Sequence, residues 1–223
     1  VVIGGDGSFR GAKDLSDEFG VLTIGIPGTI DNDLQYTDYT LGFDTAVNTC
    51  LDIINKLRDT MTSHERISVV EVMGRHCGDI ALFSGIASGA EIIVVPEITF
   101  DMDDIVMKIN RSRASGKHSN IIVVAEGVMS AEQFARQLQD VTTYSVRPTC
   151  IGHVQRGGSP SMADRMLAAQ FGNKAVRLLN EGVGNRAVGI RKNEIIDMDI
   201  IEAVSMKKKF NYELYETLQM ISM

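Results

Sequence analysis

Cysteine is scarce in this sequence, and long hydrophobic runs are missing. Three cysteines occur in 223 residues, at Cys50, Cys77 and Cys150, and no two have the C-x-x-C spacing of a redox or zinc motif. A small, odd number of thiols is typical of a reducing compartment. No apolar segment has the length needed to cross a bilayer, and the first residues do not resemble a signal peptide. We therefore expect a cytoplasmic protein with no membrane partner.

Positive charge is also in short supply. Lys and Arg total 22 against 29 Asp and Glu, a formal net charge of −7. The overall field repels polyanions, so an anionic ligand needs a local basic site and nucleic acid is not an expected partner. Hydrophobic residues at 44% and charged residues at 23% are close to globular averages, which predicts one large domain or two smaller ones with a buried core.

Short apolar runs rich in Ile and Val alternate with longer segments of helical periodicity. After a first strand at residues 1–3, the runs predict strands over 21–26, 67–72, 92–95, 121–125 and 187–190. The clearest helical stripe joins Phe43 to Leu57 at three- and four-residue spacing. Strands that are apolar throughout indicate an α/β fold with mostly parallel sheets, covered by helices on both faces. Ligands of such folds bind in the loops that follow the strands.

The first of these loops is rich in glycine. Gly4-Gly5-Asp6-Gly7-Ser8 follows a strand and precedes an amphipathic segment over 9–19, which Gly20 closes. Glycines let the backbone approach an anion, the helix N-terminus supplies N–H groups, and Asp6 can hold Mg²⁺ on phosphate oxygens. The motif predicts a phosphate site, although a plain structural turn remains the alternative. The spacing is not that of a Walker A loop.

The second loop, residues 27–33, places two carboxylates and a hydroxyl after one strand. Thr29, Asp31 and Asp33 lie within five residues. Beside a bound phosphate, one carboxylate can accept the proton of a substrate hydroxyl while the other orients it or a metal. Taken alone, the segment would equally suit an Asx turn.

Cationic residues gather near the later strand ends. Segments 71–75 and 125–127 repeat the placement of polar side chains after a strand, and segment 147–160 adds a Gly-Gly turn with a helix opened by Ser159 and Pro160. The cations concerned are Arg66, Arg75, Arg147, His153 and Arg156. Each alone would be an ordinary surface charge, but together they predict a site for a phosphorylated metabolite.

Four spaced motifs resemble 6-phosphofructokinase of the bacterial ATP-dependent type. They are GGDGS at 4–8, PGTIDND at 27–33, RISVVEVMGR at 66–75 and GHVQRGGSP at 152–160. The resemblance covers essentially the whole chain in order. It implies transfer of the ATP γ-phosphoryl group to the 1-hydroxyl of fructose 6-phosphate, with Mg²⁺, in glycolysis.

The resemblance also implies residue roles. Asp31 would be the general base, with Thr29 and Asp33 in support, and Arg75 would stabilise charge on the transferring group. Nucleotide phosphates would meet Gly5, Asp6, Gly7 and Ser8, with Asp6 also binding the metal. The substrate-binding positions are Arg66, Met73, Gly74, Glu126, Arg147, His153, Val154, Gln155 and Arg156. Arg66 and Arg147 would reach into a neighbouring subunit, which implies a homotetramer.

An effector site is implied as well. Positions that contact ADP or phosphoenolpyruvate in the family are matched by Arg58, Gly89, Glu91 and Lys117. Ser115 departs from the pattern, because a basic residue is usual there. Loss of a cation that faces phosphate should weaken effector binding, and we expect muted allostery.

The family architecture implies two αβα lobes. We expect a nucleotide-binding lobe at 1–42 and 155–205, and a fructose 6-phosphate-binding lobe at 43–154 and 206–223. The sequence opens on a strand without methionine, and about the N-terminal third of the family's chain has no counterpart in it. We therefore expect a preceding segment, and we expect this chain by itself to be inactive.

Three alternatives stay open. A pyrophosphate-dependent phosphofructokinase is disfavoured because such relatives carry Asp and Lys where this chain has Gly7 and Gly28. Another kinase that shares a GGDG loop, such as an NAD or diacylglycerol kinase, is disfavoured by the TIDND and GHVQRGGSP segments. A catalytically silent or truncated subunit is disfavoured by the presence of Asp6, Asp31 and Arg75, although truncation would be compatible with it.

Overall fold

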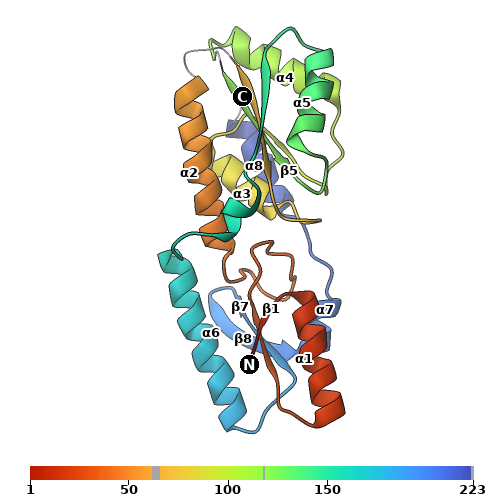
Figure 1. Cartoon of the computed structure of the whole chain (residues 1–223), viewed down its shortest axis with the longest axis vertical. Helices are drawn as coiled ribbons and strands as arrows, with labels where there is room; N and C mark the ends of the chain where they lie inside the picture. Colours follow the sequence, from red (N-terminus) through yellow and green to blue (C-terminus); the bar gives the residue numbers. More distant parts are fainter. Residues whose placement is uncertain (62–65, 118, 222–223) are drawn as a thin grey trace. The chain divides into compact units, whose positions relative to one another are not determined.

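The computed structural model describes residues 1–61, 66–117 and 119–221. The chain divides into two compact units, each with its own sheet and helices (Figure 1). Unit 1 comprises Val1–Thr45 and Ser159–Lys209, and unit 2 comprises Ala46–Gly158 and Phe210–Met223. Within the described residues, no helix has the length and apolar character needed to span a bilayer.

Unit 1 is built on a four-stranded sheet of order β1-β2-β7-β8. Its strands are β1 (Val2–Gly4), β2 (Ile24–Pro27), β7 (Arg186–Arg191) and β8 (Glu194–Asp199). The first three run parallel, whereas β7 and β8 form an antiparallel hairpin. The hairpin turns on Lys192 and Asn193, whose φ angles of 51° and 64° are those of a two-residue turn that follows the twist of the strands.

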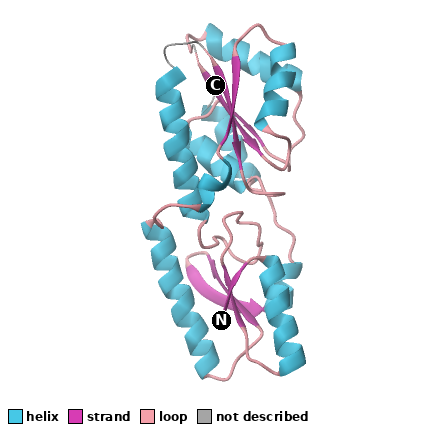
Figure 2. Ribbon diagram, viewed as in Figure 1, coloured by secondary structure: helices cyan, strands magenta, loops and turns pink. Residues whose placement is uncertain are grey.

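Helices cover both faces of this sheet (Figure 2). α1 (Asp6–Phe19) and α7 (Ile200–Ser205) bury Phe9 and Ile200 on one face. α6 (Met162–Asn180) buries Phe171 against Ile24 and Val188 on the other. Gly20, with φ 67°, ends α1 as the sequence predicts, because glycine adopts the left-handed conformation without a Cβ clash.

Unit 2 is built on a parallel four-stranded sheet of order β4-β5-β3-β6. These strands are β3 (Ile67–Val72), β4 (Ile92–Val94), β5 (Asn120–Ala125) and β6 (Val146–Cys150). α4 (Met102–Ala114) and α5 (Ala131–Asp140) pack on one face around Phe134. α3 (Asp79–Ser88) packs on the other, where a Cβ at Gly85 would meet Ile93. The unit also contains α2 (Phe43–Met61), of which the part from Ala46 onward belongs to it. The short 3-10 helix η1 (Gly152–Arg156) and α8 (Tyr212–Ile221) complete the unit.

The α/β class with mostly parallel sheets is confirmed, but several elements differ from expectation. β6 and β8 were not predicted, since both are polar and partly exposed edge strands without a continuous apolar run. β2 begins at Ile24 rather than at residue 21, because Val21 and Leu22 are exposed. α6 begins after Ser161, whose side chain accepts the N–H of Asp164, and not at Ser159 and Pro160.

The unit boundaries lie at 45, 158 and 209, a few residues beyond the predicted 42, 154 and 205. Asp164 supplies the physical reason for the first shift. Its carboxylate accepts the N–H groups of Gly42 and Thr45, each at 2.9 Å, and Thr45 Oγ1 accepts the N–H of Ser161. These bonds join the start of α2 to unit 1.

Candidate active site

The glycine-rich loop lies at the N-terminus of α1 in unit 1. Gly5 precedes the helix in an extended conformation and provides no side-chain cap, and the N–H of Phe9 makes the first helical bond, to Gly5 O at 3.1 Å. The first turn of a helix presents N–H groups that no helical carbonyl accepts. Gly7 and Ser8 are exposed in that turn, and a Cβ added at Gly7 would meet no atom within 4 Å. This geometry suits a phosphate group.

The TIDND loop lies directly beside the glycine-rich loop. Gly4 and Pro27 are partners at the carboxyl ends of β1 and β2, and Gly28 N donates to Gly4 O at 3.0 Å. A Cβ built at Gly5 would lie 3.8 Å from the Cβ of Thr29. The structure thus brings together the two loops that the sequence marked for phosphate and for acid–base chemistry.

The two carboxylates of this loop differ in environment. Asp31 is 5% exposed, and its N–H donates to Thr29 Oγ1 at 3.3 Å. Asp33 is partly exposed, but its Oδ1 is buried and has no hydrogen-bond partner within the described residues. Buried carboxylate oxygens are normally satisfied, so an oxygen of this kind suits a ligand or an ordered water.

Asp6 is the predicted ligand of a magnesium ion, although the described residues hold no group of three or more His, Cys, Asp or Glu side chains that could bind a metal. It occupies the first position of α1, its side chain is 49% exposed, and its carboxylate is bonded by Arg10 Nε at 3.1 and 3.2 Å. Magnesium in phosphoryl-transfer sites is held by one or two carboxylates together with substrate phosphate oxygens. An exposed carboxylate at the N-terminus of a helix is compatible with that kind of site.

In unit 2, the loop after β3 carries Gly74 and Arg75 in unusual conformations. Their φ angles are 135° and 52°, and Arg75 is exposed. Glu126, at the end of β5, accepts the N–H of Gly74 at 3.2 Å and that of Arg75 at 2.9 Å. A Cβ at Gly127 would lie 1.9 Å from Arg75 O, so glycine is required for this close approach. Glu126 and Gly127, which follow the neighbouring strand β5, therefore hold the loop after β3 in one conformation.

The GHVQR segment forms η1, directly after β6. His153, Val154 and Arg156 are exposed, with Val154 at 62%. Gln155 is 1% exposed, and both ends of its amide bond to the protein. The polar side-chain atoms of Gln155 are therefore engaged inside unit 2, and its predicted role in substrate binding stays a prediction.

Arg66 lies directly before β3, and Arg147 lies on the neighbouring strand β6 of the same sheet. Arg66 precedes β3 and is partly exposed, and its carbonyl accepts the N–H of Asn120 at 3.4 Å. Arg147 is exposed on β6, which forms the edge of the sheet, paired with Ser68. Both arginines are accessible from outside unit 2.

The four residues predicted for an effector form two contacting pairs in unit 2. Arg58 Nη2 donates to the carbonyls of Ser88 and Gly89, at 2.7 and 3.0 Å. Lys117 Nζ lies 3.7 Å from Glu91 Oε1, while Glu91 Oε2 accepts the N–H of Ile121 at 2.7 Å. Ser115, the position that departs from the family pattern, caps the C-terminus of α4, and its hydroxyl donates to Ser112 O.

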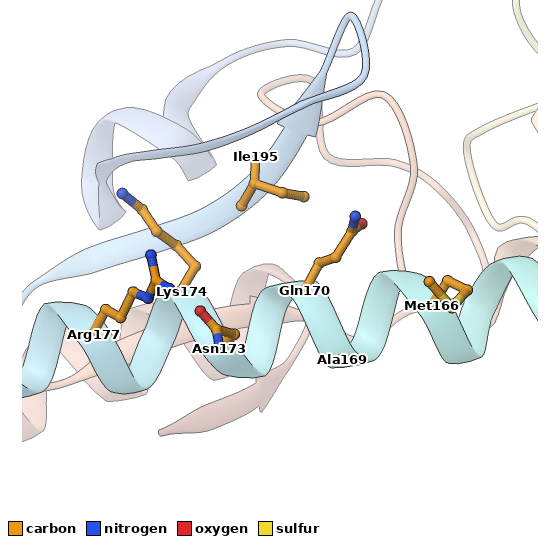
Figure 3. Close-up of a pocket in the computed structure, with 7 residues that line it drawn as sticks. All are labelled: Met166, Ala169, Gln170, Asn173, Lys174, Arg177 and Ile195. Carbon is orange, nitrogen blue, oxygen red and sulfur yellow. The ribbon is translucent and has the colours of Figure 1, made fainter.

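A shallow cavity of about 490 Å³ lies between α6 and β8 (Figure 3). Its lining residues are Met166, Ala169, Gln170, Asn173, Lys174, Arg177 and Ile195. None of them belongs to the motifs that the sequence marked. Lys174, which borders it, pairs with Asp197 at 2.7 Å.

Two polar residues that hold the TIDND loop, one within it and one after it, escaped the sequence analysis. Asn32 has φ 52° and is 2% exposed, and Thr40 is 1% exposed. They bond to each other and to the loop backbone. The residue type of Asn32 could have predicted its left-handed conformation, because asparagine tolerates that conformation better than most residues. Nothing in the spacing singled out Thr40.

Known proteins resemble the chain in both sequence and structure. The phosphofructokinase family profile matches residues 1–179. A protein of Clostridium tetani named ATP-dependent 6-phosphofructokinase is 60% identical over 222 residues, which is 100% of this chain and 69% of that protein. One of Clostridium acetobutylicum with the same name is 56% identical with the same coverage.

Among solved structures, phosphofructokinase from Saccharomyces cerevisiae superposes with a TM-score of 0.83 at 30% identity, over 98% of this chain and 33% of that one. A pyrophosphate-dependent phosphofructokinase from Marinobacter aquaeolei has a TM-score of 0.81 at 24% identity, over 95% of this chain and 61% of that one. The fold is therefore shared with a protein named for pyrophosphate, whereas the sequence relatives above are named for ATP. On the family profile and the close sequence relatives, this chain belongs to the phosphofructokinase family.

Proposed function

We propose that the protein is an ATP-dependent 6-phosphofructokinase. In this reaction the γ-phosphoryl group of ATP passes to the 1-hydroxyl of fructose 6-phosphate, which gives fructose 1,6-bisphosphate, ADP and a proton. The observation that carries the proposal is the contact between the glycine-rich loop and the TIDND loop, where Gly28 N donates to Gly4 O at 3.0 Å and a Cβ built at Gly5 would lie 3.8 Å from Thr29 Cβ. A helix N-terminus that suits an anion, next to a buried carboxylate, supports the proposal, because phosphoryl transfer needs both functions.

Asp31 accepts the hydroxyl proton as the bond to phosphorus forms. Thr29 Oγ1, which accepts the N–H of Asp31, holds the base in place, and Asp33 supports it. Gly5, Gly7 and Ser8 line the nucleotide phosphates. Asp6 would hold Mg²⁺, which would supply positive charge to the phosphate oxygens of the donor. Arg75 stabilises the charge that develops on the transferring group.

The sugar phosphate is bound by residues of unit 2. Met73, Gly74 and Glu126 contact the sugar, while the exposed His153 and Arg156 bind the 6-phosphate beside Val154. Arg66 and Arg147 complete the site of a neighbouring subunit in a homotetramer. Their accessibility supports this role, because a residue that reaches another chain cannot be buried in its own.

ATP is the proposed donor rather than pyrophosphate. The open space around Gly7 leaves room for a nucleotide α-phosphate, which an aspartate at that position would repel. At Gly28, a side chain would begin 2.6 Å from Ile3 Cγ2, so the lysine of pyrophosphate-using relatives would require Ile3 to move. The close relatives named for ATP agree with this choice.

We also propose an effector site for ADP or phosphoenolpyruvate at Arg58, Gly89, Glu91 and Lys117. The two pairs described above bring cationic groups and backbone carbonyls into one part of unit 2. Ser115 adds no charge there, so regulation is expected to be muted. Three free cysteines, Cys50, Cys77 and Cys150, support a cytoplasmic location, and neither a membrane nor nucleic acid is a proposed partner.

The deciding experiment measures ADP release from ATP and Mg²⁺, with and without fructose 6-phosphate, for the natural full-length protein that contains this sequence. Asp31→Asn should lower sugar-dependent turnover by about 10² to 10⁴, as expected for loss of a general base. Asp52→Asn, on the exposed surface of α2, is the matched control and should leave turnover unchanged.

Two other results would contradict the proposal. Turnover with pyrophosphate but not with ATP would show that the donor argument from Gly7 and Gly28 is wrong. A folded protein without turnover on either donor would favour a catalytically silent subunit.

A further inference from the structure

Gln155 is a buried polar residue that ties two segments of unit 2 together. Its Oε1 accepts the backbone N–H of Met73 at 3.0 Å, and its Nε2 donates to Gly152 O at 3.0 Å. The side chain is 1% exposed. One amide therefore connects the end of β3 to the beginning of η1.

The two segments that it joins carry different parts of the proposed substrate site. Met73 and Gly74 follow β3 and are proposed to contact the sugar. His153 and Arg156 are exposed on η1 and are proposed to contact the 6-phosphate. Gln155 lies between His153 and Arg156 on η1. Its Oε1 bonds to the segment after β3, and its Nε2 bonds to the first residue of η1. A shift of its amide would change the spacing between phosphate and sugar contacts.

Cys50 is a third hydrogen-bond partner of the Gln155 amide. Cys50 Sγ, on α2, lies 3.2 Å from Gln155 Oε1 in hydrogen-bond geometry. Burial raises the pKa of the Cys50 thiol to about 12, so it remains protonated and able to donate at neutral pH. With two donors on Oε1 and an acceptor for Nε2, the orientation of the amide is determined. A methionine of similar shape would satisfy none of these groups.

We propose that Gln155 is a positioning residue that sets the distance between the phosphate contacts and the sugar contacts, and thereby selects sugar phosphates by length. The inference rests on the proposed function, because it takes the substrate to be a phosphorylated sugar bound by unit 2. Gln155 does not touch the substrate. It acts through the backbone of Met73 and through the geometry of η1.

The test compares Gln155→Met with Gln170→Met in the natural full-length protein. Gln170 is an exposed residue of α6 outside the proposed machinery, which makes it a matched control. Two quantities are measured: the Kd of fructose 6-phosphate without a donor, by calorimetry, and kcat/KM for fructose 6-phosphate relative to sedoheptulose 7-phosphate, a sugar phosphate longer by one carbon.

Gln155→Met should raise the Kd and KM of fructose 6-phosphate by about tenfold or more, since small misplacements of binding groups have large effects. The preference over sedoheptulose 7-phosphate should fall about fivefold, and the KM of ATP should stay within about twofold. Gln170→Met should match the wild type in every measurement. Unaltered affinity and preference in Gln155→Met, or an equal loss for both sugars, would overturn the inference while leaving the proposed function intact.

A wild-type protein that neither binds nor phosphorylates fructose 6-phosphate would refute the proposed function, and the inference with it. If Gln155→Met does not fold, Cys50→Ala and Cys50→Ser test the same amide from its other partner. Cys50→Ala removes the donor and should raise the Kd about threefold, whereas Cys50→Ser keeps a donor and should stay near the wild type. Wild-type affinity in Cys50→Ala would then count against the inference.

Discussion

Asn32 Oδ1 accepts the backbone N–H of Thr40 at 3.1 Å, which closes the loop that carries Asp31. Thr40 Oγ1 in turn donates to Thr29 O at 2.6 Å, and Asn32 Nδ2 donates to Asp38 O at 3.3 Å. Asn32 itself adopts φ 52°, a conformation in which most side chains are strained. The position of the proposed base is thus determined by polar neighbours that belong to the same loop.

Thr40→Val should lower kcat about tenfold and leave the KM of ATP nearly unchanged. Valine has the shape of threonine but cannot donate to Thr29 O, so the loop loses a buried hydrogen bond worth about 1 kcal/mol and leaves a carbonyl unsatisfied. Steady-state kinetics on the full-length protein provides the measurement.

Thr40→Ser is the control, because it keeps the hydroxyl and should retain kcat within about threefold. Equal rates for Thr40→Val and the wild type would show that the loop keeps its shape without this bond.

Gly127→Ala should lower the thermal midpoint by about 4–8 °C, equivalent to roughly 2 kcal/mol, because its Cβ would lie 1.9 Å from Arg75 O and one of the two backbones must move. The kcat of the variant should fall as well, since Arg75 moves with its carbonyl. Differential scanning calorimetry and the ADP-release assay test the two effects.

The matched substitution is Gly172→Ala in α6, where an added Cβ meets no atom within 4 Å. Alanine is a better helix former than glycine, so this variant should gain about 0.5–1 kcal/mol. If Gly127→Ala proved as stable as Gly172→Ala, the close approach of the two loops would not constrain the fold.

Much of the fold could be predicted from the sequence because the relevant forces are local and repetitive. Strands β3 and β5 are buried on both faces and are rich in Ile and Val. Residues 121–125 of β5 form a continuous apolar run, whereas Ser68 and Glu71 interrupt the run in β3. β6 could not be found in this way. It is an exposed edge strand that contains Pro148. It forms because β3 pairs with it by backbone hydrogen bonds, and its own residues do not encode that pairing.

Residues of the candidate site show the same contrast between local and long-range signals. Asp31 and the glycines of residues 4–8 carry chemistry that depends on residue type, so their spacing was informative. The role of Gln155 depends on which backbone groups come within 3.0 Å of its amide. Gly152 O is only three residues away, but the N–H of Met73, just after β3, is 82 residues away in sequence. Only the folded chain brings them together.

Cys150 should react slowly with iodoacetamide at pH 7 although it is exposed. Its pKa is raised, first by partial burial of the thiol and then by the charge and hydrogen bond of Glu71, whose Oε1 lies 3.5 Å from Sγ. Glu71→Gln removes that charge, lowers the pKa and should speed alkylation severalfold, because the thiolate is the reactive form. Peptide mass spectrometry follows each cysteine separately.

Glu132→Gln should have a weaker effect in the same direction, since Glu132 acts on Cys150 through its charge without a hydrogen bond. Cys50 should stay unmodified throughout, because it is buried and its pKa is raised to about 12. Identical alkylation rates for Cys150 in Glu71→Gln and the wild type would rule out Glu71 as the cause.

Asp197 should make the stability of unit 1 depend on pH. Burial alone would raise its pKa, but hydrogen bonds and charges from Lys174 and Arg186, each 2.7 Å away, outweigh burial and lower it from the ordinary value of 3.8. A lowered pKa stabilises the fold above the ordinary value, and this contribution disappears as the pH falls through the lowered pKa. Asp197→Asn should therefore cost about 1–2 kcal/mol at pH 7, or roughly 3–6 °C, and this cost should disappear as the pH falls through the lowered pKa of Asp197.

Asp52→Asn provides the comparison for this effect. Asp52 pairs with Lys56 on α2, but the two side chains are 63% and 72% exposed, and such pairs contribute little. Its thermal midpoint should follow the wild type at every pH, while that of Asp197→Asn approaches the wild type only in acid. A constant gap between Asp197→Asn and the wild type down to pH 2 would mean that the carboxylate acts through packing, because an electrostatic contribution must vanish once the group is protonated.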